Sequence, residues 1–342
     1  MKNKVQAVGF YQHLPIYNHD SLVDLQVPQP TVGKHDLLVK VAGVSVNPVD
    51  VGVRQSGNSK PLVNPKIIGW DAVGQVIQTG SEVNLFSVGD RVWYAGDFTR
   101  SGSNAQEQLV DERIVGRAPK NLSIQQAAAI PLVGLTAYEV LFEKMKINKI
   151  NNDNKTILII NGAGGVGSIA IQLAKLAGLK VIATASKPQA IEWVKQLGAD
   201  YVVNHHEDLV TQIRQLGYHF VDYILNLNNL DAHWNEIAQL IKPDGTVGAT
   251  TENRHLIDLQ KLTKKRVTFV WEWMYSKSYY QTIDLVSQHD ILNELAQLYE
   301  NEKLQPIDTI HYAPINAANM KKAHANVEAG TMIGKVVLTG WE

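Results

Sequence analysis

The sequence predicts a mixed α/β protein with two parts, a β-rich N-terminal region and a doubly wound parallel-sheet region. Up to about residue 120, short apolar runs are separated by Gly and Pro at close intervals, as in small barrels. From Thr156 to about residue 275, apolar runs alternate with helical patterns, which indicates βαβ units. A glycine-rich turn follows the first of these runs and opens the next helix.

The bulk composition excludes several classes of function. The 342 residues are enough for two domains, and the composition, 45% hydrophobic and 19% charged, is that of a globular protein. The net charge of -1 gives little support for nucleic-acid binding. Cysteine is absent, which excludes disulfides, thiolate catalysis and Cys-based metal sites. Because no signal-like or membrane-length apolar segment is visible, we expect a soluble, cytoplasmic protein with no nucleic-acid or membrane partner.

The first part has three clear strand-like runs, at 37–41, 73–77 and 91–94. A helix is expected to begin near Ile124, where Ser123 is placed to cap it and Gln126 stands at the capping-box position. The helical pattern continues from there through Pro131.

The second part contains a run of predicted parallel strands at 157–160, 181–184, 201–203, 223–227, 246–249 and 267–270. An amphipathic helix follows after about residue 280, and the segment GKVVLTG at 334–340 is again strand-like.

The glycine turn has the pattern G-x-G-x-x-G between a predicted strand and a predicted helix, the context of a dinucleotide-binding site. Its residues are Gly162, Ala163, Gly164, Gly165, Val166 and Gly167. Gly162 allows the tight turn, Gly164 lets the backbone approach a pyrophosphate, and Gly167 lets helix and strand pack closely. A plain glycine-rich turn without a ligand is the alternative.

The residues after the second strand of this unit favour NADPH over NADH. An NAD site usually places an acid there to bind the ribose 2′-OH. This chain has Ser186 and Lys187 instead, and the nearest acid, Glu192, falls within the following helix. A hydroxyl and a cation suit a 2′-phosphate; the alternative for Lys187 is a solvated surface lysine.

With these motifs, the chain resembles the medium-chain dehydrogenase/reductase superfamily, close to the quinone oxidoreductases, over essentially its full length. The matching segments are GVSVNPVD at 43–50, GWDAVG at 69–74, GDRV at 89–92 and PLVGLTAY at 131–138. The segment VWEWMYSKS at 270–278 resembles a bacterial subgroup named zinc-type alcohol dehydrogenase-like.

The resemblance implies a GroES-like catalytic domain of residues 1–125 and 280–342, closed by a strand at 334–338. A Rossmann NADP(H)-binding domain of residues 126–279 would be inserted between these two segments. It also implies a homodimer, formed in relatives by pairing of the nucleotide-domain sheets at their edges.

The same resemblance argues against zinc. Zinc alcohol dehydrogenases of the superfamily use Cys, His and Cys as catalytic ligands, and the matching positions here are Asn47, Trp70 and Leu132. Their structural zinc site needs four cysteines, which this chain lacks. Since adjacent histidines point in different directions, we expect no paired metal site at His205 and His206 and no metal elsewhere.

The resemblance also supplies candidate catalytic residues. Asn47 is expected near the substrate oxygen, with a turn-capping amide as its alternative. Asp50 is expected to orient a water or the ribose, or else to support the loop. Thr136 matches a threonine beside the nicotinamide; its alternative is a helix hydroxyl bonded to a backbone carbonyl.

Further candidates concern the cofactor and the substrate. His205 matches a position near the adenosine phosphate, and others follow strand ends of the doubly wound sheet. The cofactor candidates outside the turn and its selectivity loop are His205, Asn226, Leu227, Ala249, Thr250 and Lys335. The candidates for an aromatic substrate pocket are Trp70, Trp271, Trp273 and Tyr275. Core packing, with Trp271 and Trp273 on one strand face, is the alternative for these aromatic residues.

Three functional hypotheses follow. The first is an NADPH-dependent reductase of quinones or α,β-unsaturated carbonyls, whose acceptors need orientation, a dry pocket and hydrogen-bond donors rather than a metal. The second is a metal-dependent alcohol dehydrogenase, as the subgroup name suggests. The third is an NADPH-bound binding protein without turnover.

Overall fold

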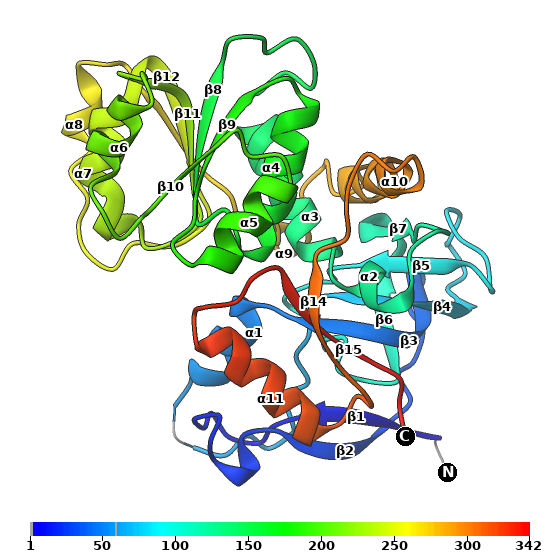
Figure 1. The fold of residues 1–342 in the computed structure, drawn as a ribbon. Helices are drawn as coiled ribbons and strands as arrows, with labels where there is room; N and C mark the ends of the chain where they lie inside the picture. The colour runs from blue at the N-terminus through cyan, green and yellow to red at the C-terminus, as the bar shows by residue number, and fades with distance from the viewer. Residues whose placement is uncertain (1–2, 59) are drawn as a thin grey trace. The chain divides into compact units, whose positions relative to one another are not determined.

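The computed structural model describes residues 3–58 and 60–342, which form two compact units (Figure 1). The first unit comprises Met1–Leu132 and Tyr275–Glu342, and the second comprises Val133–Met274. The chain therefore leaves the first unit and returns to it. The divisions fall at 132/133 and 274/275, where the sequence placed them at 125/126 and 279/280.

The first unit is built on a largely antiparallel sheet with the strand order β14-β15-β3-β4-β5-β7, in which β6 also pairs with β3. A separate hairpin is formed by β1 and β2. The strands of this unit are β1 (Lys4–Gly9), β2 (Val23–Pro28), β3 (Asp36–Val46), β4 (Ala72–Thr79), β5 (Arg91–Tyr94), β6 (Glu107–Asp111), β7 (Val115–Arg117), β14 (Asp308–Tyr312) and β15 (Lys335–Thr339).

The register of β3 brings distant segments of the chain together. Strand β15 runs antiparallel to β3 with Val336 opposite Val46, which places Lys335 beside the end of β3. Strand β4 pairs with the other edge of β3, with Ala72 opposite Val44. The residues just beyond these pairs, Asn47, Asp71 and Lys335, therefore meet at one end of the sheet.

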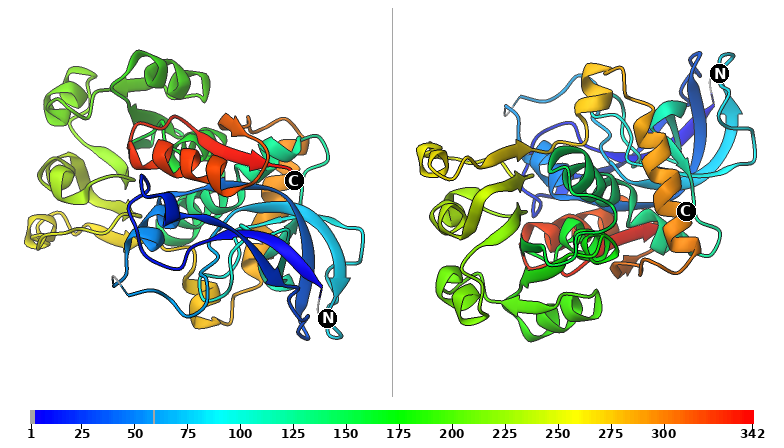
Figure 2. Two further views of the ribbon diagram at one scale, coloured as in Figure 1. Left: turned by 90° about the horizontal axis from the view of Figure 1, so that it is seen from below. Right: turned by 90° about the horizontal axis from the view of Figure 1, so that it is seen from above.

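Helices cover this sheet and its hairpin. Helix α11 packs against α1, β1, β2 and β15 (Figure 1), and α10 lies along β7, as the right-hand view of Figure 2 shows. The helices that begin in this unit are α1 (Pro48–Gln55), α2 (Ile124–Ala128), α3 (Pro131–Tyr138), α9 (Ser276–Tyr280), α10 (Ser287–Glu300) and α11 (Ala317–Glu328), with 3₁₀ turns at His19–Ser21 and Glu112–Ile114.

The helix at Ile124 begins as the sequence predicts, since Ser123 and Gln126 bond reciprocally at its start. The expectation of one helix running through Pro131 was wrong. Helix α2 ends at Ala128 and α3 begins at Pro131. Proline has no N–H to donate inside a helix but is well suited to the first helical position.

The second unit is a six-stranded, all-parallel sheet with the order β10-β9-β8-β11-β12-β13. Its strands are β8 (Thr156–Ile160), β9 (Lys180–Thr184), β10 (Tyr201–Val203), β11 (Val221–Asn226), β12 (Ile241–Ala249) and β13 (Thr268–Trp271). Its helices are α4 (Gly165–Leu176), α5 (Pro188–Gln196), α6 (Leu209–Gln215), α7 (Leu230–Leu240) and α8 (Gln260–Thr263), with a π-helix at Glu139–Lys144 that follows α3.

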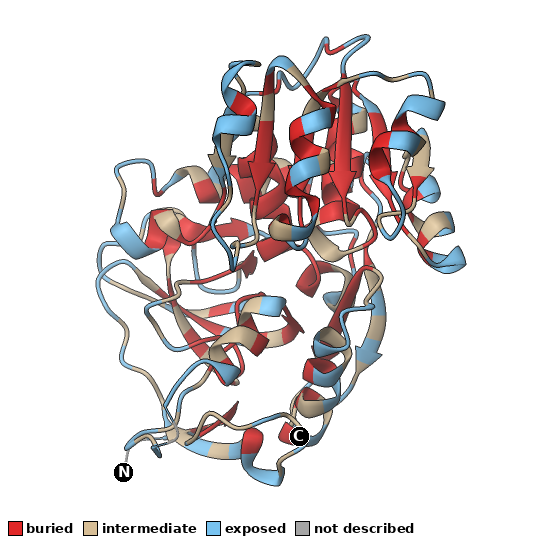
Figure 3. Ribbon diagram, turned by 90° about the vertical axis from the view of Figure 1, so that its left-hand side faces the viewer, coloured by how far each residue is buried: buried red, intermediate tan, exposed pale blue. Residues whose placement is uncertain are grey.

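This doubly wound sheet confirms the predicted fold class and the six predicted strands. Every residue of β8 is buried, and four of the five residues of the neighbouring β9 are buried too (Figure 3). Strands buried on both faces are apolar throughout, which is why the sequence showed runs rather than alternation. Among the described residues, no helix is both long and apolar enough to cross a membrane.

Candidate functional site

The first candidate group lies at the junction of β3 and α1. Asn47 is the N-cap residue of α1, and Pro48 takes the first helical position. The carboxylate of Asp50 reaches back and accepts a hydrogen bond from the backbone N–H of Asn47 at 2.7 Å. The side-chain amide of Asn47 is therefore left available for other partners.

A buried polar cluster is centred on the carboxylate of Asp71. Oδ2 of Asp71 accepts hydrogen bonds from Ser45 Oγ at 2.6 Å, Asn47 Nδ2 at 2.7 Å and Lys335 Nζ at 3.0 Å. Its Oδ1 accepts one from the backbone N–H of Leu132 at 2.7 Å. Lys335 Nζ also donates to the amide oxygen of Asn47. The amide of Asn47 thus bridges an anion and a cation.

The ion pair inside this cluster is fully desolvated. The side chain of Asp71 is 0% exposed and that of Lys335 is 5% exposed. A buried carboxylate is tolerated when it is paired with a cation and its lone pairs accept hydrogen bonds, and both conditions hold here. The sequence did not identify Asp71 or Ser45 as site residues, although Asp71 directly follows Trp70 in the GWDAVG segment.

The cluster does not fit a zinc ion. Asn47, Trp70 and Leu132 occupy the positions where zinc members carry ligands, and none of them offers a thiolate or imidazole. The carboxylate of Asp71 accepts four hydrogen bonds, one of them from an ammonium group, so its lone pairs are already used. Within residues 3–58 and 60–342 there is no group of three or more His, Asp or Glu side chains placed to hold a metal.

Asp50 is the titratable group of this site whose environment is most unusual. Its side chain is 1% exposed, and burial raises the pKa of its carboxyl to about 7, against the opposing effects of the Asn47 N–H and the Lys335 ammonium. Such a carboxyl can hold a proton near neutral pH.

Aromatic side chains pack beside the polar cluster. Trp70 stacks on Phe98 with ring centroids 5.1 Å apart, and Tyr275 meets Trp70 edge-on at 6.1 Å. Two of the four predicted pocket residues, Trp70 and Tyr275, thus lie together and are buried. Trp271 and Trp273 belong to the second unit and are 44% and 40% exposed, and Trp271 meets the ring of Phe269 edge-on with centroids 5.1 Å apart.

The glycine turn of the second unit links β8 to α4. A Cβ on Gly167 would lie 2.5 Å from the carbonyl oxygen of Asn161 and 2.6 Å from that of Gly162, so only glycine allows this packing. A Cβ on Gly162 would lie 2.9 Å from that of Ala183. The amides of Ala163, Gly165 and Val166 belong to the same strand-to-helix turn. Its geometry matches the close approach expected for a dinucleotide turn.

One buried side chain at the carboxyl ends of the strands has unsatisfied polar atoms. Asn226 ends β11 and is 0% exposed, yet neither atom of its side-chain amide has a hydrogen-bond partner among the described residues. Leu227 follows it, and the backbone N–H of Thr250, next to Ala249, bonds to the Asn226 carbonyl. Orphaned polar atoms at this edge suit a nucleotide that brings its own donors and acceptors.

The proposed selectivity residues follow β9. Lys187 is the N-cap residue of α5, exposed and outside every described ion pair, and the partly buried Ser186 precedes it. The nearest acid, Glu192, accepts a hydrogen bond from Gln196 on its own helix at 3.2 Å. The loop therefore presents a cation and a hydroxyl with no competing carboxylate.

The remaining predicted residues are placed as follows. His205 is partly buried, its Nδ1 has no hydrogen-bond partner among the described residues, and burial lowers the pKa of its imidazole. Thr136 is buried in α3. Lys335, predicted to bind the cofactor, has its ammonium in the polar cluster of the first unit.

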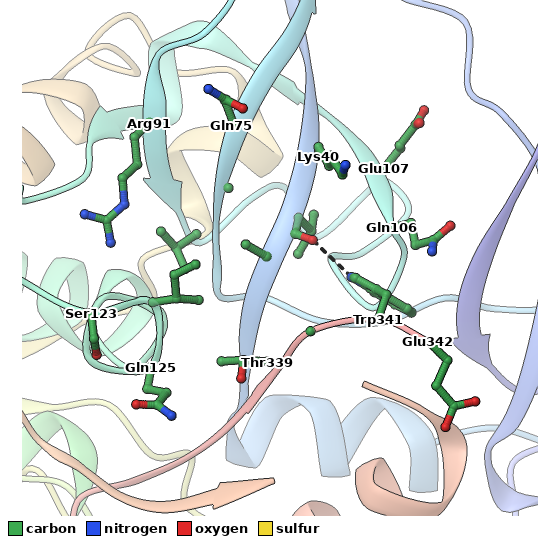
Figure 4. Close-up of a pocket in the computed structure, with 16 residues that line it drawn as sticks. Lys40, Gln75, Arg91, Gln106, Glu107, Ser123, Gln125, Thr339, Trp341 and Glu342 are labelled. Carbon is green, nitrogen blue, oxygen red and sulfur yellow. Dashed lines mark hydrogen bonds between the residues drawn. The ribbon is translucent and has the colours of Figure 1, made fainter. Parts of the chain in front are cut away.

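A separate pocket of about 1020 Å³ opens on the first unit (Figure 4). Lys40, Gln125 and Glu342 lie at its wall, and Trp341 donates to the Val41 carbonyl at 3.0 Å beside it. None of the residues of the polar cluster lines this pocket.

Comparison with known proteins finds a matching family model in each of the two units. Residues 165–288 match the zinc-binding dehydrogenase family, and residues 33–150 match the GroES-like domain of alcohol dehydrogenases. A zinc-type alcohol dehydrogenase-like protein of Staphylococcus aureus is 41% identical over 98% of this chain and 99% of its own length. A chloroplastic quinone-oxidoreductase homolog of Spinacia oleracea is 28% identical over 93% of this chain and 94% of its own length.

Solved structures show similarity to the same two kinds of protein, alcohol dehydrogenases and quinone oxidoreductases. A candidate zinc-dependent alcohol dehydrogenase from Rhizobium etli CFN 42 superposes with a TM-score of 0.95 at 42% identity, with all of both chains covered. The quinone oxidoreductase of Coxiella burnetii superposes with a TM-score of 0.81 at 26% identity, over 99% of this chain and 100% of that one.

Proposed function

The chain belongs to the medium-chain dehydrogenase/reductase superfamily, and from this premise we propose that it transfers hydride from NADPH to a quinone or an α,β-unsaturated carbonyl compound without zinc. Oxidoreductase chemistry follows from the family. The acceptor class, the cofactor preference and the independence from metal are the proposal.

The observation that supports the proposal most directly is that the Asp71 carboxylate already accepts hydrogen bonds from several donors. Four donors already occupy it, and one of them is the Lys335 ammonium. A divalent cation would have to displace Lys335 and would find no thiolate or imidazole beside Asp71. This observation supports a site whose fixed positive charge is a lysine side chain.

A site without metal favours some hydride acceptors over others. Oxidation of a simple alcohol requires loss of a proton of very high pKa, which zinc members assist by coordinating the oxygen. A quinone or enone is already polarised, and the anion formed by hydride addition is delocalised. The protein then needs to orient the two partners and to provide hydrogen-bond donors. Names of relatives such as the Spinacia homolog agree with this choice.

The second unit supports NADPH as the hydride donor. The Gly162–Gly167 turn suits a pyrophosphate, and Asn226 offers an unsatisfied amide at the ligand edge of the sheet. Ser186 and Lys187 suit a 2′-phosphate, and the reduced nicotinamide supplies the hydride when the cofactor is bound.

The proposal is tested by a screen of quinones, alkenals, cyclic enones, aldehydes and alcohols, with NADPH and NADH, or their oxidised forms for the alcohols, assayed in parallel. We expect NADPH oxidation with quinones or enones, and slower oxidation of NADH. Turnover confined to alcohols and aldehydes would contradict the acceptor class. Tight NADPH binding with no turnover on any compound would instead indicate a binding protein.

A further inference from the structure

Two buried polar atoms beside the Asp71 cluster have no hydrogen-bond partner among the described residues. They are Nε1 of Trp70, in a side chain 2% exposed, and Oδ1 of Asp50, in a side chain 1% exposed. Leaving a buried donor or acceptor unsatisfied costs about 1–3 kcal/mol, and a bound ligand is one way to satisfy such an atom.

Both atoms belong to one group of contacts. Trp70 precedes Asp71, whose carboxylate binds the Asn47 amide at 2.7 Å, and the N–H of Asn47 binds Asp50 at 2.7 Å. Tyr275 is close to both Trp70 and the two carboxylates. Its ring contacts Trp70, and the carboxylates of Asp50 and Asp71 add to the effect of burial in raising the pKa of its hydroxyl.

Aromatic packing fixes the indole of Trp70. Phe98 stacks on it with an interplanar angle of 22°, and Phe98 also contacts Tyr275 with ring centroids 5.3 Å apart. A rigid aromatic group with a few placed polar atoms is typical of sites for flat, mostly apolar ligands. An indole N–H can only donate, so the ligand atom that it binds must be an acceptor.

We infer that Trp70 Nε1–H and the Asp50 carboxyl bind the carbonyl oxygen of the hydride acceptor, and that Asp50 protonates this oxygen. The inference rests on the proposed function. When bound, NADPH would supply the hydride, its own C–H bond breaking as a C–H bond forms at the β-carbon of an enone, and the π electrons of the enone would move onto its oxygen to give an enolate. An O–H bond then forms at that oxygen as the Asp50 O–H bond breaks. The product is an enol, and the Asp50 carboxylate regains a proton from water.

The protonation state of Asp50 agrees with this role. Burial raises its pKa to about 7, so the protonated form is available at neutral pH. A carboxylic acid kept neutral by an apolar environment and paired with an aromatic donor is an established way to stabilise an enolate. Asp71 raises the pKa of Asp50 further, and Lys335 lowers it.

Other charged groups near α1 lie toward its far end. Arg54 forms an ion pair with Glu328 of α11 and donates to His324 Nδ1 at 3.4 Å. The ring of His13 contacts the carbonyl oxygens of Val53 and Arg54. They are therefore held by partners of their own, and the pKa of Asp50 is set by burial, by the hydrogen bonds from Asn47, and by the charges of Lys335 and Asp71.

The test compares the variants Asp50→Asn and Trp70→Phe with a matched control, Trp93→Phe. Trp93 is 0% exposed and also has an unpartnered Nε1, but it packs on Tyr299 with ring centroids 6.3 Å apart. The readouts are kcat and KM for 2-cyclohexenone, a p-benzoquinone control reaction, NADPH affinity and the melting temperature.

We expect Asp50→Asn to lower kcat for the enone by about 100-fold or more, the usual effect of a general acid. Trp70→Phe is expected to lower kcat/KM about tenfold, as for one lost hydrogen bond, while NADPH affinity stays unchanged in both. Trp93→Phe should match the wild type in kcat/KM. Wild-type enone rates in Asp50→Asn, or equal losses in Trp70→Phe and Trp93→Phe, would overturn the inference.

The wild-type protein supplies a check that is independent of variant folding. Its kcat/KM for the enone should fall as pH rises through about 7 with loss of one proton, because Asp50 must be protonated. A profile that is flat from pH 6 to pH 9, with NADPH bound throughout, would overturn the inference while leaving the proposed function intact. If the wild type reduces no acceptor at any pH, the proposed function itself fails, and the inference fails with it.

Discussion

Replacement of Lys335 by Met should destabilise the first unit strongly. The change removes the cation from Asp71, whose side chain is 0% exposed, and leaves the carboxylate with neutral donors only. Removing one partner of a buried ion pair lowers the free energy of unfolding by about 3–5 kcal/mol, because the other charge stays buried and unpaired. For a unit of about 200 residues, each kcal/mol lowers the melting temperature by about 2–4 °C. We therefore expect a decrease of about 6–20 °C.

The assay is thermal unfolding followed by near-ultraviolet circular dichroism, with two further variants. In Lys335→Met/Asp71→Asn the uncompensated charge is gone, so most of the loss should be recovered. Lys34→Met removes only the exposed ion pair with Glu82, so the free energy of unfolding should fall by less than about 1 kcal/mol. The reasoning is refuted if Lys335→Met melts within 2 °C of the wild type, or if the double variant is no more stable than the single one.

Three further predictions concern the cofactor turn and Asp50. Lys187→Asp should raise the Kd for NADPH at least tenfold more than the Kd for NADH in fluorescence titrations; equal effects would remove it from the 2′-phosphate site. The folded-state pKa of Asp50 lies near 7, above its ordinary value of 3.8, so the stability it contributes is complete below about pH 4 and is lost as pH rises through 7. Between pH 4 and pH 8, the free energy of unfolding of the wild type should therefore fall by about 4 kcal/mol more than that of Asp50→Asn, as measured by thermal unfolding. If the free energies of unfolding of the two proteins change in parallel with pH, this prediction is wrong. Gly167→Ala should lower the melting temperature and abolish NADPH binding, because its Cβ meets backbone oxygens at 2.5 and 2.6 Å, whereas Gly52→Ala, with nothing within 4 Å inside helix α1, should leave NADPH binding unchanged and should not lower the melting temperature.

The parallel sheet was predictable because its strands are buried on both faces and appear as continuous apolar runs. The start of α2 was predictable from the capping residues Ser123 and Gln126. The break at Pro131 was missed because the apolar pattern continues across it. There the missing N–H of proline outweighs the periodicity.

The polar cluster was only partly predictable. Asn47 and Asp50 are close in sequence and were identified through the motif that contains them. Lys335 is 288 positions from Asn47, and only the pairing of β15 with β3 brings them together. Asp71 looked like part of a signature rather than a site residue, because its partners come from three other segments.

The aromatic candidates show the same limit. Trp70 and Tyr275 meet because the chain returns to the first unit at Tyr275. Trp271 and Trp273 precede that return and stay in the second unit, exposed, at and just beyond the end of β13. The four aromatic candidates therefore belong to two different units.

The central claim is that hydride transfer by this chain needs no metal, and the most direct measurement is metal content together with activity on one sample. The protein is purified without added zinc, its metal content is measured by mass spectrometry, and NADPH oxidation by a quinone is followed before and after dialysis against a strong chelator. We expect far less than one metal ion per chain and an unchanged rate of NADPH oxidation. Near-stoichiometric zinc, with activity lost to the chelator and restored by added zinc, would contradict it.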